Sequence, residues 1–278
     1  MKNSIKTELW KVFHSFPFWI SLFIGSLTVM SNVSYNAQVA AELEAANVAA
    51  AKLLGYKQGV AGYALISHWI AVSTDSVGSR YLYLIWPILA ALPYGWSYCQ
   101  EMRSGLSNQY MLRSGRSAYM VSKYTAVFIS GGLAVSFPVV VDLIANAMIL
   151  PDCLPKVLLS TIYNRGAFAE LFYSYPWIYA LIWITADFIF GGAAAGLCFL
   201  VGKSIRFQVM VTLFPFALLF LWNALTEVLE VPIFSLICLD MATPRMLASR
   251  SALMIQLSLM VLFSIAAAFG KGNKYDLV

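Results

Sequence analysis

Long apolar runs alternate with short polar stretches from residue 16 to residue 270. A helix needs about 20 mainly apolar residues to cross a membrane, because each residue rises about 1.5 Å through a hydrocarbon core about 30 Å thick. The runs that meet this requirement are 16–34, 81–99, 124–150, 177–201, 207–225 and 251–270. The pattern predicts an all-α integral membrane protein with about six transmembrane helices in a single transmembrane domain, 1–278.

The composition also indicates that the apolar runs of this chain lie in lipid. Hydrophobic residues make up 60% of the sequence and charged residues only 11%. A soluble domain carries about 25% charged residues. No polar stretch between the apolar runs is long enough to encode a second, soluble core.

Lysine and arginine set the expected orientation, because they concentrate in cytoplasmic segments. With the N-terminus inside, eleven of the 18 basic residues are cytoplasmic: Lys2, Lys6, Lys11, Arg103, Arg113, Arg116, Lys123, Lys203, Arg206, Lys271 and Lys274. The remaining seven lie on longer outside loops: Lys52, Lys57, Arg80, Lys156, Arg165, Arg245 and Arg250. We expect a multi-pass protein of the plasma (cytoplasmic) membrane with both termini in the cytoplasm.

The segment before the first run, 1–15, has apolar residues at helical spacing. Ile5, Leu9 and Val12 recur on one stripe, while the lysines lie mostly off it. This pattern predicts an amphipathic interfacial helix on the inner leaflet, with a frayed basic flank as the alternative.

The first outside region, 35–80, is predicted to be an extracellular helical region. Its alanine-rich start, 37–54, favours a solvated external helix because alanine has the highest helix propensity. The stretch 60–74 is apolar for fifteen residues and could form a seventh span. A crossing there would move the basic loop 100–123 outside, so we expect an external or partly inserted helix instead.

Prolines interrupt the last outside region, 227–250, which predicts a re-entrant or interface-bound hairpin shielded by protein. Cys153 and Cys238 both fall outside in this topology and could form a disulfide, although two separate thiols are the alternative. The four cysteines and two histidines are scattered along the chain, so the sequence predicts no metal site.

The sequence also predicts no catalytic residues and no cofactor in this chain. Gly202, Lys203 and Ser204 match only the end of a phosphate-binding loop, because Leu197 occupies its first glycine position. Neither histidine lies deep in a span, and no two carboxylates are neighbours at helical spacing inside one.

Two carboxylates, Asp142 and Asp187, lie within predicted spans. A carboxylate at mid-bilayer costs about 2.5–3.5 kcal/mol to insert, so we expect Asp187, near the centre of its helix, to face protein or a wet cavity. A hydrogen bond between helices is one interpretation, and a direct transport role is the other. Gly192 and Gly196 form a Gly-x-x-x-Gly pair that predicts close helix packing within the chain.

The loop 100–123 carries the strongest functional signal, since it combines both charges, glycines and an aromatic residue in a short segment. Its residues are Glu101, Met102, Arg103, Ser104, Gly105 and Leu106, then Met111, Leu112, Arg113, Ser114, Gly115, Arg116, Ser117, Ala118 and Tyr119, with Lys123 opening the next run. Pro87, Leu89, Ala90, Ala91, Leu92 and Pro93 precede it. With the six-span layout, this segment resembles the permease subunit of the type-two ABC transporters.

That resemblance implies a short cytoplasmic coupling helix in 100–123 that docks on a separate ABC ATPase subunit. The residues expected to make this contact are Glu101, Gly105, Arg113, Arg116, Tyr119 and Lys123. ATP and Mg would be bound by the ATPase, and a second permease copy or a paralogue would complete the transporter. Membrane lipid is the other expected partner, and nucleic acid is not expected.

The implied function is ATP-driven export of a peptide, a lipid-linked compound or an antimicrobial compound. Two alternatives remain open from the sequence. One is a non-transporting membrane scaffold or sensor, in which the basic loop binds another partner. The other is a secondary transporter driven by protons through Asp187.

Overall fold

The computed structural model describes residues 2–54, 64–73, 75–155, 167–205, 207–231 and 250–270. Within these ranges all regular elements are helices, and five are long and apolar enough to cross a membrane. They are α2 (Phe16–Leu54), α6 (Arg116–Ala147), α8 (Pro176–Gly196) with its continuation α9 (Cys198–Gly202), α10 (Gln208–Val228) and α13 (Arg250–Phe269). The prediction of an all-α protein is confirmed for the described residues, and five helices among them, one fewer than predicted, are long and apolar enough to cross a membrane.

The second predicted span, 81–99, is not one continuous helix as expected. α3 (Val77–Ala91) has 15 residues, and α4 (Ser97–Arg103) follows after a turn. Pro93 lies in this turn and cannot donate a backbone hydrogen bond. Other backbone bonds persist, such as that from the N–H of Gly95 to the oxygen of Ala91 at 2.9 Å. α3 and α4 therefore form one bent helical path.

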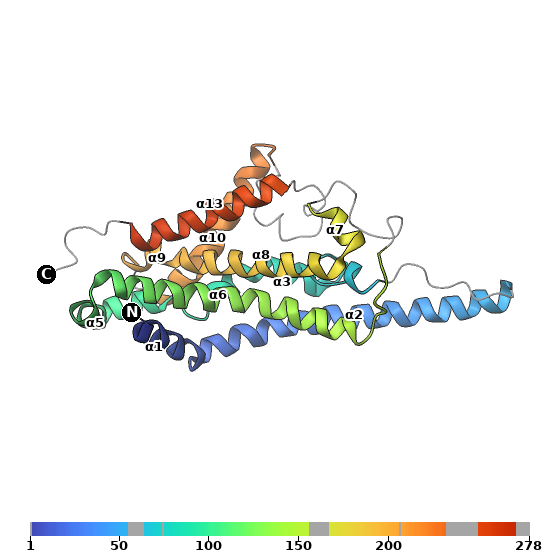
Figure 1. Ribbon diagram of the computed structural model, residues 1–278, viewed down its shortest axis with the longest axis horizontal. Helices are drawn as coiled ribbons and strands as arrows, with labels where there is room; N and C mark the ends of the chain where they lie inside the picture. The colour runs from blue at the N-terminus through green and yellow to red at the C-terminus, as the bar shows by residue number, and fades with distance from the viewer. Residues whose placement is uncertain are drawn as a thin grey trace.

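α2 is longer than any predicted span. The expected external helix at 37–54 is the continuation of the first apolar run, and together they form one helix of 39 residues. No glycine or proline occurs from Ser26 to Leu54, and alanine propagates a helix well. In Figure 1 this helix, in blue, runs past the end of the neighbouring helices.

α6 and α8 form the centre of the bundle, and small residues let them approach closely. A Cβ atom added at Gly192 would lie 2.7 Å from the backbone oxygen of Phe128 on α6. A Cβ atom at Gly196 would meet the hydroxyl of Ser264 on α13. The missing side chains thus permit backbone approach between neighbouring helices.

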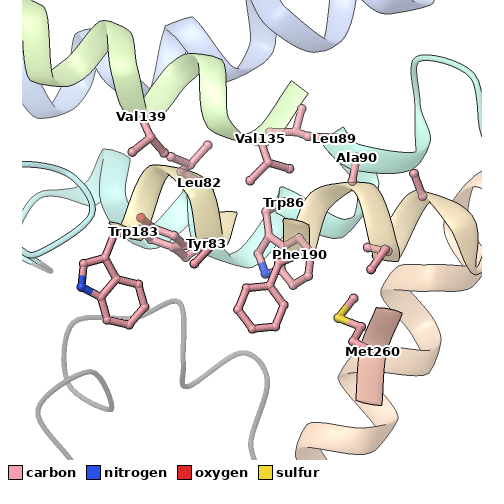
Figure 2. Packing of buried hydrophobic residues seen from close by; sticks show 14 of the residues in the cluster. Leu82, Tyr83, Trp86, Leu89, Ala90, Val135, Val139, Trp183, Phe190 and Met260 are labelled. Carbon is pink, nitrogen blue, oxygen red and sulfur yellow. The ribbon is translucent and has the colours of Figure 1, made fainter. Parts of the chain in front are cut away.

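Large side chains fill the space around this central pair. Figure 2 shows Trp86 of α3 beside Phe190 of α8, with Val135 of α6 close by. Trp183 of α8 and Met260 of α13 belong to the same buried cluster. Four helices distant in sequence thus share one apolar core, whose close packing stabilises the bundle through many van der Waals contacts.

Two short helices lie at one end of the bundle (Figure 1). α1 (Lys2–Phe13) forms where an amphipathic helix was predicted in 1–15, and α5 (Leu106–Ser114) is a short helix within 100–123. Glu8 and Val12 of α1 are buried, so this face of α1 packs on protein. A further short helix, α7 (Ala169–Ser174), precedes α8.

Most of the predicted hairpin at 227–250 lies outside the described residues, as does Cys238. Cys153 is exposed. The hairpin and the disulfide therefore stay predictions.

Candidate functional site

Six polar side chains, five of them buried and Lys11 half-buried, form a network at the α5 end of the bundle, which we name the charged cluster. Its members are Glu8, Lys11, Tyr94, Glu101, Tyr119 and Lys123. They come from α1, the turn between α3 and α4, α4 itself, and the start of α6. Two carboxylates face two ammonium groups, so the cluster balances its own charge.

Lys123 is the centre of the charged cluster, and its side chain is 0% exposed. Its Nζ donates to Glu101 Oε1 at 2.7 Å and to Glu8 Oε2 at 3.0 Å. It also lies 3.2 Å from Tyr94 Oη and 4.4 Å from the centroid of that ring. A buried ammonium group needs such partners, because burial without them would remove its charge.

Two tyrosine hydroxyl groups donate further hydrogen bonds to the two carboxylates. Tyr119 Oη donates to Glu101 Oε2 at 2.7 Å, and Tyr94 Oη donates to Glu8 Oε2 at 2.9 Å. Tyr119 also stacks on Tyr110 of α5, with ring centroids 6.2 Å apart. The ring of Tyr110 in turn lies 4.7 Å from Lys11 Nζ. The network therefore connects α1, α4, α5 and α6.

Protonation on α1 follows from these contacts. Burial raises the pKa of Glu8, but the ammonium groups of Lys123 and Lys11 outweigh burial and hold that pKa below its ordinary value. Burial lowers the pKa of Lys11, but its bond to Glu8 and the charge of Glu101 raise that pKa above its ordinary value. Both groups are charged at neutral pH.

α5 lies next to this network and is bounded by two glycines. Gly105 has φ of 72° and Gly115 has φ of 81°, a left-handed region that residues with a Cβ rarely adopt. A Cβ atom at either position would meet nothing within 4 Å, so backbone conformation and not space requires glycine. α5 thus begins and ends at fixed turns, packed against α4 and α6.

Most side chains of α5 are exposed. Leu112 is 87% exposed, and Leu106 and Tyr110 are also exposed. Arg113 and Arg116 are exposed beside them. These exposed side chains of α5, with Arg116 at the start of α6, are named the α5 face and include apolar, aromatic and cationic groups.

The residues predicted to contact a partner therefore separate into two groups, apart from Gly105, which forms the turn before α5. Arg113 and Arg116 lie on the α5 face, whereas Glu101, Tyr119 and Lys123 point inward to the charged cluster. The inward group is placed to hold α5 and its neighbours in position. Direct partner contact by that group stays a prediction.

A second buried network, the amide cluster, consists of Asn32, Asn36, Asp142 and Asn146. Asp142 is 0% exposed, and its Oδ1 accepts a hydrogen bond from Asn32 Nδ2 at 2.9 Å. Its Oδ2 accepts from Asn146 Nδ2 at 2.9 Å and from the backbone N–H of Ile70 at 2.8 Å. Asn36 Nδ2 donates to Asn146 Oδ1 at 2.9 Å. The cluster joins α2 to α6.

The amide cluster also holds an irregular segment against the bundle. We expected an external or partly inserted helix at 60–74, but the described part, 64–73, is not α-helical and contains only the short 3-10 helix η1 (Leu65–Ser67). Ile70 donates to Asp142, His68 accepts from Asn36 at 2.9 Å, and Trp69 Nε1 donates to the backbone oxygen of Val139 at 2.9 Å. Side chains of α2 and α6 thus satisfy backbone groups that a helix would satisfy internally.

The other predicted intramembrane carboxylate, Asp187, is buried on α8, a helix that packs on α3, α6 and α13. It therefore faces protein, as its cost in lipid required. It belongs to neither named cluster.

Sequence reasoning missed Glu8, Lys11 and Tyr94 in the charged cluster, and Asn32, Asn36 and Asn146 in the amide cluster. A signal for the amides was present, because Asn32 and Asn36 lie four residues apart in an apolar helix, as do Asp142 and Asn146. Such spacing places polar groups on one helix face. No comparable spacing links Glu8 to Lys123.

Comparison of the chain with protein-family models, with curated proteins and with solved structures gave no match. The fold of the described residues, packed α-helices of which five are long and apolar enough to cross a membrane, is typical of multi-pass membrane proteins. Its function has to be argued from the two clusters and the α5 face.

Proposed function

We propose that this chain is the membrane permease subunit of an ATP-driven exporter and that the α5 face binds a separate ATPase subunit. The observation that carries the proposal is the position of α5, a short exposed helix mounted on a buried ionic network. The resemblance of 100–123 to the coupling segment of type-two ABC permeases supports the same assignment. In this proposal α3 and α4 together make the sixth membrane crossing.

The mounting of α5 suits the transfer of a mechanical push. α5 is tied to α6 by the stacking of Tyr110 on Tyr119, and α6 runs for 32 residues through the bundle. Lys123 fixes the start of α6 to α1 and α4. Rigid elements joined in this way move together, so movement of a partner at α5 would reach the membrane helices.

The α5 face has the composition of a binding surface. Protein interfaces are enriched in aromatic residues and arginine at their centres. Burial of an exposed leucine in an interface is favourable because it removes apolar surface from water. Leu112 and Tyr110 supply the apolar and aromatic groups, and Arg113 and Arg116 supply the charge. The matching partner surface is an apolar groove with an acidic rim.

The remaining parts of the proposal concern the assembled transporter. ATP and Mg are bound by the ATPase subunit, and a second permease copy or a paralogue forms the other half of the pathway. The exported compound is a peptide, a lipid-linked compound or an antimicrobial compound.

Affinity purification of the tagged protein from its native membranes tests the proposal, with mass spectrometry and an ATP hydrolysis assay on the eluate. We expect an ABC ATPase to co-purify with the wild type. We expect Leu112→Asp, or Arg113→Ala with Arg116→Ala, to reduce its recovery, because truncating a charge buried in an interface costs about 2–5 kcal/mol of binding.

Leu53→Asp is the matched control, since Leu53 is 86% exposed on the far end of α2. This variant should keep the ATPase. Equal recovery of the ATPase with all the variants would contradict docking through α5. Recovery of a partner without ATPase activity would favour a scaffold instead.

A further inference from the structure

Two oxygens in the amide cluster lack a donor. Asn32 and Asn36 are 0% and 1% exposed, and no group of the described residues donates to Oδ1 of either side chain. Their amide nitrogens are already committed to Asp142, to the backbone oxygen of His68 and to Asn146. Rotating either amide would place its oxygen against another oxygen, so the observed orientation is fixed.

Asp142 brings a buried carboxyl group to the same place. Three N–H groups donate to its two oxygens, so both oxygens act as acceptors. No lysine or arginine of the described residues pairs with it. A buried carboxylate without a cation is costly, and its hydrogen bonds from neutral amides do not balance its charge.

One free oxygen belongs to an amide that contacts this carboxylate, and the other belongs to the same network. Asn32 Oδ1 is bonded to the same carbon as the Nδ2 atom that donates to Asp142 Oδ1 at 2.9 Å. Asn36 lies one turn further along α2, on the same face, and bonds Asn146 of the same cluster. Hard cations prefer oxygen ligands such as carboxylate oxygens and amide oxygens that accept no hydrogen bond.

We propose that Asp142, with the side-chain oxygens of Asn32 and Asn36, binds one monovalent metal cation, Na⁺ or K⁺, between α2 and α6. A divalent cation fits less well, because such sites usually contain more than one carboxylate. The cation supplies a positively charged partner for Asp142 and a partner for each of the two amide oxygens. Segment 64–73, which bonds to Asp142 and Asn36, is then held by a cation-dependent centre. This inference does not rest on the proposed transport function.

Direct binding of ²²Na⁺ to the purified full-length protein in detergent tests the site, with unlabelled NaCl, KCl and choline chloride as competitors. We expect saturable binding that NaCl or KCl displaces and choline chloride does not. The Tm should rise with NaCl or KCl concentration and not with choline chloride at equal ionic strength, because a ligand of the native state stabilises it. No saturable binding together with the same Tm in all three salts would indicate buried water in place of a cation and would overturn the proposal.

Two variants locate the site. Asp142→Asn should lose ²²Na⁺ binding and the salt-specific shift in Tm, while Asp187→Asn, a change at the other buried carboxylate, should keep both. Asn32→Asp supplies a second carboxylate and should shift the preference from Na⁺ to Ca²⁺. If Asp142→Asn folds and binds ²²Na⁺ like the wild type, or if Asp187→Asn is the variant that loses binding, the cation is not bound at the amide cluster.

Discussion

The charged cluster and the amide cluster lie near opposite ends of α6 and stabilise different kinds of structure. Lys123 and Asp142 are 19 positions apart on α6, a separation of about 28 Å at about 1.5 Å per residue. The charged cluster joins helices that are already complete, and its charges balance. The amide cluster satisfies the backbone of an irregular segment, and its single carboxylate has no basic partner in the described residues.

This difference predicts the effect of removing one member from each cluster. Removal of one member of the charged cluster leaves buried charges unpaired, which is the more costly outcome. Removal of the carboxylate from the amide cluster takes away its charge and leaves neutral donors unpaired. The first change should affect the attachment of whole helices, and the second should affect mainly segment 64–73.

The largest effect is expected for Lys123→Met. This change leaves Glu8 and Glu101 buried without their common partner, and the loss of stability should be about 3–5 kcal/mol. Thermal unfolding in detergent and limited proteolysis near α1 would measure it. Lys52→Met, a change at an exposed lysine on α2, is the control and should unfold like the wild type. Equal stability of the two variants would show that the charged cluster does not hold α1 and α4 to α6.

A smaller and more local effect is expected for Asp142→Ala. Three N–H groups lose their acceptor. Movement of the irregular segment 64–73 should let water reach them, so we expect a net loss of about 1–3 kcal/mol, the cost of one buried unsatisfied donor. Hydrogen exchange at the backbone amide of Ile70 and its neighbours in 64–73 should become faster. Exchange in α1 and α5 should not change. Faster exchange at both ends of the bundle would mean that the two clusters are not independent.

The smallest effect is expected from pH and concerns only the charged cluster. The lowered pKa of Glu8 gives a contribution to stability that is complete above its ordinary value of 4.5 and is lost as pH falls through the lowered pKa. The raised pKa of Lys11 gives a contribution that is complete below its ordinary value of 10.5 and is lost as pH rises through the raised pKa. The contribution of these two groups should therefore be level between these limits and fall outside them.

Unfolding of the wild type and of Glu8→Gln across this pH range would measure that contribution. The variant should lose part of the acid dependence, because residue 8 no longer takes up a proton. If the loss of stability at low pH is unchanged in Glu8→Gln, a group other than Glu8 is responsible for it.

Much of the fold follows from local pattern. Apolar runs of spanning length predicted the long helices, and the alanine-rich sequence of 37–54 predicted helix beyond the first run. The pattern did not show that these two pieces are one helix, since polarity changes between them while helix propensity does not. The 81–99 run also predicted a helix, but Pro93 divides it, and apolar content alone does not reveal such a break.

The candidate site was predicted less completely. The loop 100–123 was identified from its charges, glycines and tyrosine, and a short helix is present there. The direction of its side chains was not predictable, because Glu101 and Lys123 find their partners in residues distant along the chain. Lys123 and Glu8 are separated by 115 positions. Polar residues in a loop between spans are otherwise expected to face water.

The sequence by itself determined the class of protein, because a chain with 60% hydrophobic residues in runs of spanning length can be stable only with those runs in lipid or packed together. It also determined the ends of α5, since only glycine readily adopts the backbone of residues 105 and 115. The tertiary structure alone decided which polar residues meet. Burial makes an unpaired charge or amide costly, and whether a group is buried depends on how helices from the whole chain pack.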